Sequence, residues 1–157
     1  MDDVDTFLAA VMPGLTDAET ALHNGDAEPR KRLWSRDDPM TVFGAVLTVV
    51  GPDEVASAFD VLASRFSNCT SFEYQVIASG VSGDLAYVVG IEHTTASVGG
   101  APPLPYALRV TTIFRCEGGE WRIVHRHGDP LPDADSDSTR LQLSRMGSLF
   151  SRPGNAG

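Results

Sequence analysis

The stretch LRVTTIFRCEGGEWRIVHRHGD, residues 108–129, decides the fold class of this chain. Apolar and polar side chains alternate through residues 108–115 and again through residues 121–127, which is the period of a half-buried β-strand. The Glu-Gly-Gly sequence at residues 117–119 favours a tight turn between them. The two segments are therefore predicted to pair as an antiparallel hairpin.

Working backwards, the same alternation continues to about residue 70, whereas the preceding residues have helical spacing. Strands are expected at residues 41–45, 72–76, 85–95, 106–116 and 121–127, and helices at residues 7–22, 28–34 and 52–66. Helices followed by a meander of long strands are typical of an α+β domain, with the helices packed on one face of a curved sheet.

Local signals refine the helices. Pro13-Gly14 is expected to kink the first helix or divide it, and Thr16 and Glu19 have the spacing of a capping box that would restart it. Asn24-Gly25 is a good helix stop.

Composition points to one compact acidic domain. The chain has 157 residues, 42% of them hydrophobic, and a formal net charge of −9. Such a surface repels phosphate backbones and anionic lipids, so neither nucleic acid nor membrane is an expected partner. Apolar runs such as residues 42–50 are too short to span a bilayer, and the acidic start does not resemble a signal peptide. We expect a cytoplasmic protein in which Cys69 and Cys116 are buried free thiols, rather than a disulfide or a reactive cysteine.

Residues 24–45, 52–66, 108–115 and 118–129, taken in order, resemble the nuclear-transport-factor-2-like superfamily, and within it the SnoaL-like branch. The Trp-x-Ile-Val-His-x-His ending is also similar to the association domain of calcium/calmodulin-dependent kinases. The resemblance implies a cystatin-like roll: a cone-shaped, strongly curved antiparallel sheet wrapped around three N-terminal helices. It also implies a pocket inside the cone and a homodimer formed through the outer face of the sheet.

The resemblance covers roughly residues 5–129, and we assign residues 1–129 to this domain. The composition changes after Asp129, so residues 130–157 are expected to form an acidic tail rich in Pro and Ser. Within the tail, residues 140–150 either form a short amphipathic helix that docks on the body or fray.

Ketosteroid isomerases of the same superfamily need a carboxylate base, a tyrosine and a protonated aspartate. The corresponding positions fall near Gly44, Thr20-Ala21 and Arg109-Val110, which supply none of these groups. Ketosteroid isomerase activity itself is therefore not expected.

Arg109 is the first candidate ligand-binding residue, and it shares a strand face with Thr111. A guanidinium among apolar neighbours needs either a wet pocket or an ion pair. Two readings stay open: Arg109 anchors an anionic ligand in the cone, or it pairs with Glu92, Asp37 or Asp38.

Two histidines follow on the last strand. His125 and His127 are two residues apart, so their side chains share a face at a spacing of about 6.6 Å along the strand. We expect His127 to act as an acid or base and His125 to contact the ligand, unless both are structural. Asp37 and Asp38 are candidates for a general base, although an Asp-Asp-Pro sequence is also typical of a turn.

Trp34, Tyr74, Glu92 and Thr111 complete the expected pocket lining. The sequence contains no HExxH pattern, Cys/His cluster or phosphate-binding glycine motif, so neither a metal nor a cofactor is expected.

Three functions therefore compete. The chain is an acid–base enzyme, such as an isomerase, cyclase or dehydratase acting on a polyketide-like or other small organic substrate; a non-catalytic binder of a small metabolite such as a carboxylate; or an oligomerisation module.

Overall fold

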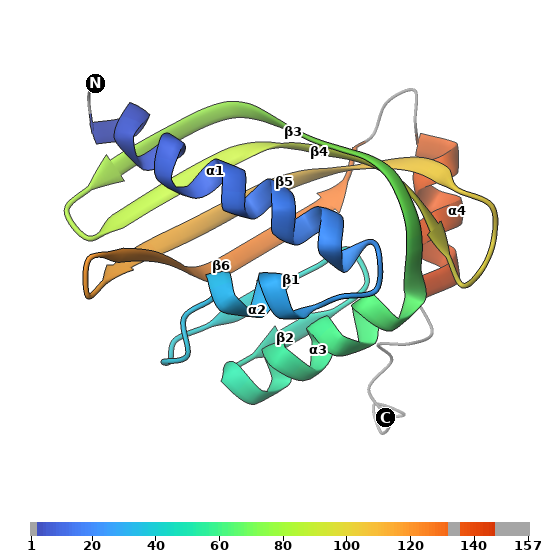
Figure 1. The fold of residues 1–157 in the computed structure, drawn as a ribbon, viewed down its shortest axis with the longest axis horizontal. Coiled ribbons are helices and arrows are strands. Elements are labelled where there is room, and N and C mark those ends of the chain that lie inside the picture. Colours follow the sequence, from blue (N-terminus) through green and yellow to red (C-terminus); the bar gives the residue numbers. More distant parts are fainter. Residues whose placement is uncertain (1–2, 132–135, 147–157) are drawn as a thin grey trace, which may run out of the picture.

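The computed structural model describes residues 3–131 and 136–146, which form one curled sheet with helices packed against it (Figure 1). The helices are α1 (Asp3–Leu22), α2 (Glu28–Leu33), α3 (Pro52–Arg65) and α4 (Ser136–Met146). The strands are β1 (Thr41–Phe43), β2 (Thr48–Val50), β3 (Phe66–Ser82), β4 (Leu85–Val98), β5 (Leu104–Glu117) and β6 (Glu120–Pro130).

The six strands lie in the order β2-β1-β6-β5-β4-β3. Neighbouring strands are antiparallel except β1 and β6, which run parallel. The sheet is curled but not closed, and Figure 1 shows α1 lying across it. The expected α+β class and strongly curved sheet are confirmed, with one parallel pair that the sequence did not suggest.

An apolar stripe on α1 makes the main contact between helix and sheet. Phe7 lies edge-on to Phe114 and Trp121, with ring centroids 5.2 and 5.1 Å apart. Helix α1 runs through Pro13 as one element, so of the two expected outcomes, a kink or a division, the division is wrong. A proline inside a helix costs about 3 kcal/mol, which is outweighed by burial of several large side chains at about 1.5–3 kcal/mol each.

Other boundaries differ from expectation at the ends of strands. Strand β3 starts at Phe66, immediately after α3, instead of at residue 72. Near its start, β3 contains a register shift between Ser67 and Ser71, and Asn68 within this shift has φ 50°. Strand β2 was not expected, because three residues are too few to show a periodicity.

A β-bulge in β6 determines which side chains of this strand point into the cone that the curled sheet forms. Opposite β5, Ile113 pairs with His125 but Phe114 pairs with Ile123, so Val124 is an extra residue in β6. Such a bulge reverses the faces of the residues that follow it. Ile123 and Arg126 are consequently both buried, although they are three residues apart.

Helix α4 packs at one end of the sheet, mainly against β5 (Figure 1). The Ala107 amide donates to Thr139 Oγ1 at 3.1 Å, and the Gln142 side-chain amide donates to the Ala96 carbonyl at 3.0 Å. Thr139 and Gln142 are fully buried. Residues 147–150 of the segment considered in the sequence lie outside the described residues.

Two further features concern the whole described chain. Cys69 and Cys116 are free and partly buried. Among the helices within residues 3–131 and 136–146, none is long and apolar enough to cross a membrane.

Candidate functional site

The inside of the cone holds a cavity of about 60 Å3, which we call the cone cavity. Apolar side chains form most of its wall, including Leu62 from α3, Leu108 from β5, and Leu143 and Met146 from α4. The polar groups on its wall are His23, Arg30, Tyr106 and Arg126.

His23 and Tyr106 form a hydrogen-bonded pair at this cavity. The His23 Nδ1 atom lies 2.7 Å from the Glu19 carbonyl oxygen, which can only accept, so Nδ1 carries the ring proton. In the neutral ring, Nε2 is therefore the acceptor, and the Tyr106 hydroxyl donates to it. The pair presents the Tyr106 oxygen, backed by an unprotonated imidazole nitrogen, to the cavity wall.

Burial keeps this histidine neutral. The protein interior lowers the pKa of His23 from 6.5 to about 4, although the nearby Glu19 carboxylate works in the opposite direction. Burial also raises the pKa of the Tyr106 hydroxyl, and the Glu92 carboxylate adds to that rise. Both members of the pair are consequently uncharged at neutral pH.

Two buried ion pairs surround the His23–Tyr106 pair. Arg30 donates to both oxygens of Glu19 at 2.9 and 2.5 Å, and Arg126 donates to both oxygens of Glu92 at 2.6 and 2.8 Å. Burial alone would raise the pKa of Glu19, but Arg30 and Arg126 together hold it at about 2. Glu19 is thus an ion-pair partner rather than a helix cap, which corrects the capping-box prediction.

Two more hydroxyl groups in the interior lack partners. Within the described residues, the buried oxygens of Tyr74 and Thr112 form no hydrogen bond of good geometry, although the Thr112 hydroxyl is close enough to act against the rise in the pKa of Tyr74. Burial raises the pKa of the Tyr74 hydroxyl, and the Glu92 carboxylate adds to that effect.

The structure places four of the expected site residues on the outer face of the sheet. Arg109, Thr111, His125 and His127 alternate with buried neighbours such as Val110 and Arg126. Their expected position in the cone is therefore wrong. The other alternating residues of β5, which include Val110 and Phe114, are more apolar than the set that contains Arg109 and Thr111. They therefore face the interior.

Arg109 is half exposed and pairs with Asp129, whose two oxygens accept from it at 3.0 and 3.1 Å. None of the three partners expected for Arg109 is used. Glu92 does lie inside the cone, but its partner is Arg126.

The two histidines of β6 lie beside Phe43 on this outer face. The Phe43 ring centroid is 5.4 Å from that of His125 and 5.8 Å from that of His127. His125 Nδ1 lies 2.7 Å from Thr41 Oγ1, and burial lowers the pKa of this ring, with nearby His127 adding to the effect.

The remaining expected residues divide between loop and core. Asp37 and Asp38 are exposed in the bend that follows α2, and neither lines the cone cavity. Trp34 is buried and packs edge-on against Phe59, with ring centroids 5.3 Å apart.

The positions compared with ketosteroid isomerases lie close to the cone cavity. Gly44 lines it, and Val110 is buried nearby in β5. On α1, the polar side chains Glu19 and His23 are buried on either side of Thr20 and Ala21, which are only partly buried.

Sequence reasoning missed His23, Arg30, Tyr106 and Arg126. A signal for His23 was present, because it follows Leu15 and Glu19 at intervals of four residues on one face of α1. A signal for Arg126 was the apolar pair Ile123-Val124, which interrupts the alternation just before it.

Comparisons with known proteins agree with this architecture. The family model described as a SnoaL-like domain matches residues 11–131. No curated protein is significantly similar in sequence to this chain.

Three solved structures show the same fold. A proposed dehydratase of the nuclear-transport-factor-2-like family from Streptomyces avermitilis is 20% identical, with TM-score 0.68, and the match covers 82% of this chain and 99% of that one. A proposed calcium/calmodulin-dependent protein kinase II association domain from Xanthomonas campestris is 14% identical, with TM-score 0.59 and 85% and 91% coverage. A protein with a cystatin-like fold from Caulobacter vibrioides is 17% identical, with TM-score 0.62 and 85% and 95% coverage.

The family model covers most of the chain, from the middle of α1 to the end of β6. All residues that line the cone cavity lie within this span, except Leu143 and Met146 of α4. The chain belongs to the SnoaL-like domain family.

Proposed function

We propose that this chain binds a small organic molecule in the cone cavity and transfers a proton on it with Tyr106 and His23. The observation that carries the proposal is the hydrogen bond from the Tyr106 hydroxyl to His23 Nε2 at the cavity wall. A buried tyrosine and a buried neutral histidine form a path along which one proton can move without leaving a net charge on the tyrosine.

The pKa of His23 limits the substrates that fit. A base with a pKa of about 4 removes a carbon-bound proton only when neighbouring carbonyl groups acidify that proton. The substrate class that we propose is therefore a 1,3-dicarbonyl compound, which is the repeating unit of polyketide-like molecules.

The proposed step moves one proton from the substrate to Tyr106 and one proton from Tyr106 to His23. The substrate C–H bond breaks, its proton passes to the Tyr106 oxygen, and the Tyr106 proton passes to His23 Nε2. The electron pair remains on the substrate as an enolate, and the positive charge of Arg126 on the same cavity wall stabilises it. Return of the proton to a different atom completes an isomerisation with no change of oxidation state.

The cavity size sets a second limit. A volume of about 60 Å3 is well below the 300 Å3 at which pockets for drug-sized ligands begin. Leu143 and Met146 of α4 form part of the wall, so a larger substrate requires these side chains to move.

Deuterium exchange tests the proposal. Ethyl acetoacetate in D2O is followed by proton NMR with and without the protein, and the wild-type chain is expected to accelerate exchange at the carbon between the carbonyls. Tyr106→Phe removes the hydroxyl relay and is expected to lower the protein-dependent rate about a hundredfold. Tyr74→Phe is the matched control, because it removes a buried hydroxyl that has no partner in the described structure.

A rate equal to that of buffer alone, or equal rates in wild type and Tyr106→Phe, would overturn the proposed catalysis. The alternative function, binding of a metabolite without turnover, is favoured by the weak basicity of His23. Under that alternative, a ligand raises the melting temperature of the wild-type chain, and no exchange above buffer is observed.

We also propose that the chain forms a homodimer through the outer face of the sheet. The support for this is an apolar row on that face of β4, where Tyr87 is 43% exposed and Val89 and Ile91 are partly buried. Exposed aromatic side chains are enriched in the centres of protein interfaces.

A further inference from the structure

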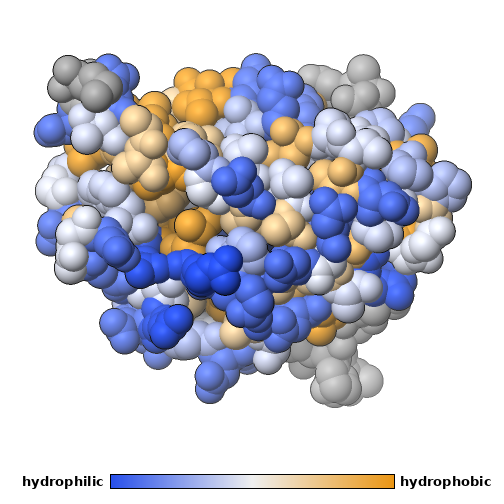
Figure 2. All heavy atoms as spheres, in the orientation of Figure 1, coloured by the Kyte–Doolittle hydropathy of each residue, from blue (hydrophilic) through white to orange (hydrophobic). Residues whose placement is uncertain are grey.

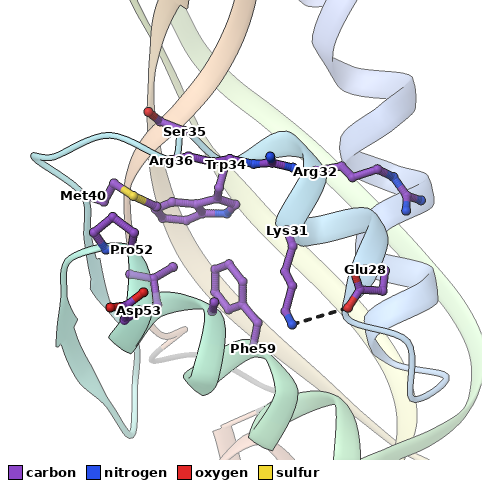
Figure 3. Close-up of a pocket in the computed structure, with 12 residues that line it drawn as sticks. Glu28, Lys31, Arg32, Trp34, Ser35, Arg36, Met40, Pro52, Asp53 and Phe59 are labelled. Atoms are coloured by element: carbon purple, nitrogen blue, oxygen red, sulfur yellow. Dashed lines mark hydrogen bonds and ion pairs between the residues drawn. The ribbon is translucent and has the colours of Figure 1, made fainter.

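A second hollow lies outside the cone, between α2 and α3 (Figure 3). We call it the α2–α3 groove. Its volume is about 350 Å3, and it shares no lining residue with the cone cavity. This size falls within the range of small-molecule binding sites.

The inner wall of the α2–α3 groove is apolar and buried. Trp34 and Phe59 meet edge to face there, and Met40 and Val55 adjoin them. All four side chains are at most 3% exposed. A buried aromatic wall of this kind suits a flat apolar ligand.

One polar group in this wall faces the groove. Trp34 as a whole is only 3% exposed, but it lines the α2–α3 groove and carries an indole N–H. Figure 3 shows the nitrogen edge of the indole facing the space between Lys31 and Phe59. A ligand with an acceptor atom in that space can take a hydrogen bond from the indole N–H.

The charges on the rim favour an anion. Lys31 is already paired with Asp60 at 2.7 Å and with Glu28 at 3.4 Å. Arg36 is exposed and has no charged partner within the described parts of the chain. Figure 3 shows Arg36 beside Trp34, whereas Asp53 lies on the other side of the groove, next to Pro52. In Figure 2, strongly hydrophilic side chains cover the region of α2.

We propose that the α2–α3 groove binds a small aryl carboxylate. Its ring would lie against Trp34 and Phe59, and its two carboxylate oxygens would accept from the indole N–H of Trp34 and the guanidinium of Arg36. The carboxylate accepts from the indole N–H and neutralises the guanidinium of Arg36, which a neutral aromatic molecule does not do. This site is separate from the proposed proton transfer in the cone and does not depend on it.

Isothermal titration calorimetry of the full chain tests the groove, with 2-naphthoate as probe and 2-naphthamide as its uncharged counterpart. Wild type is expected to bind 2-naphthoate. Arg36→Gln is expected to weaken that binding at least tenfold while changing the affinity for 2-naphthamide less than twofold. Arg109→Gln removes an equal charge from the outer face of the sheet and is expected to leave both affinities unchanged.

Trp34→Phe keeps an aromatic ring but removes the N–H donor, and several-fold weaker binding of 2-naphthoate is expected. Trp121→Phe is its control, because Trp121 packs on Phe7 away from the groove. Absence of 2-naphthoate binding at millimolar concentration would overturn the proposal. So would an Arg36→Gln affinity equal to wild type, or a loss of binding in Tyr106→Phe that places the probe in the cone.

Discussion

Arg126 and Glu92 face each other inside the cone and share two hydrogen bonds, at 2.6 and 2.8 Å, between β6 and β4. Both side chains are almost completely buried. The pair therefore supplies a fixed positive group next to the cone cavity without adding net charge to the interior.

Removal of one partner should be costly. Arg126→Met leaves the Glu92 carboxylate buried without its cation, and the expected loss is about 3–5 kcal/mol in the free energy of unfolding, measured in urea. The double variant Arg126→Met/Glu92→Leu should recover most of that loss. The exposed pair of Arg109 and Asp129 is the control, and Arg109→Gln should cost at most about 1 kcal/mol. Equal losses of unfolding free energy for the inner and outer ion pairs would show that burial does not make the inner pair more costly to break.

The two interior tyrosines should differ in the same measurement. Tyr106→Phe leaves His23 Nε2 buried without a donor and should lower the free energy of unfolding by about 1–3 kcal/mol. Tyr74→Phe removes a hydroxyl that has no partner in the described structure, so stability should be unchanged or higher. The opposite order would show that the Tyr106 hydroxyl is not bonded to His23.

The buried histidine predicts how stability depends on pH. Because the pKa of His23 is about 4 in the folded chain and 6.5 ordinarily, the unfolded chain takes up a proton first as the pH falls. Stability should therefore be complete above pH 6.5 and fall by about 3 kcal/mol towards pH 4. Between pH 4.5 and 2, protonation of Glu19 should remove more, since Arg30 and Arg126 hold its pKa at about 2.

Urea unfolding at a series of pH values checks this dependence. His23→Leu should remove most of the decline between pH 6.5 and 4 and leave the part that comes from the lowered pKa of His125, whereas His127→Gln, at an exposed position, should retain the full decline. A decline of undiminished size in His23→Leu would assign the effect to another group.

Helix α4 should control the size of ligand that the cone accepts. Leu143→Ala/Met146→Ala removes side chains from the cavity wall. The exchange rate of ethyl benzoylacetate relative to that of ethyl acetoacetate should therefore rise in this variant. An unchanged ratio would show that substrates do not enter past α4.

The proposed dimer gives a prediction for the outer face of the sheet. Tyr87→Glu places a charge in the centre of the apolar row on β4 and should convert a dimer into a monomer. Sedimentation velocity measures this directly, with the exposed Leu141→Glu in α4 as control. A wild-type chain that sediments as a monomer at high micromolar concentration would contradict the proposal.

The fold was largely predictable because its signals are long. The alternation in β4 and β5 and the stripe on α1 each extend over many residues, and the family resemblance rested on their order. The site was not predictable in the same way. A single extra residue, Val124, exchanges the two faces of β6, so parity counted from Trp121 assigns His125 to the interior where Arg126 actually lies.

Side-chain contacts between residues far apart in the sequence could not be predicted either. Glu19 has the spacing of a helix cap, and only the arrival of α2 beside α1 shows that its partner is Arg30. The contact between His23 and Tyr106 joins residues 83 positions apart, and no local pattern reports such a contact.

Nitrogen-15 NMR of the His23 ring at neutral pH tests the central claim most directly. We expect that Nδ1 carries the proton and that Nε2 has the shift of an unprotonated nitrogen accepting a hydrogen bond. Tyr106→Phe should move the Nε2 resonance but not that of Nδ1. A proton on Nε2, or titration of the ring near pH 6.5, would contradict the buried neutral pair and with it the proposed proton transfer.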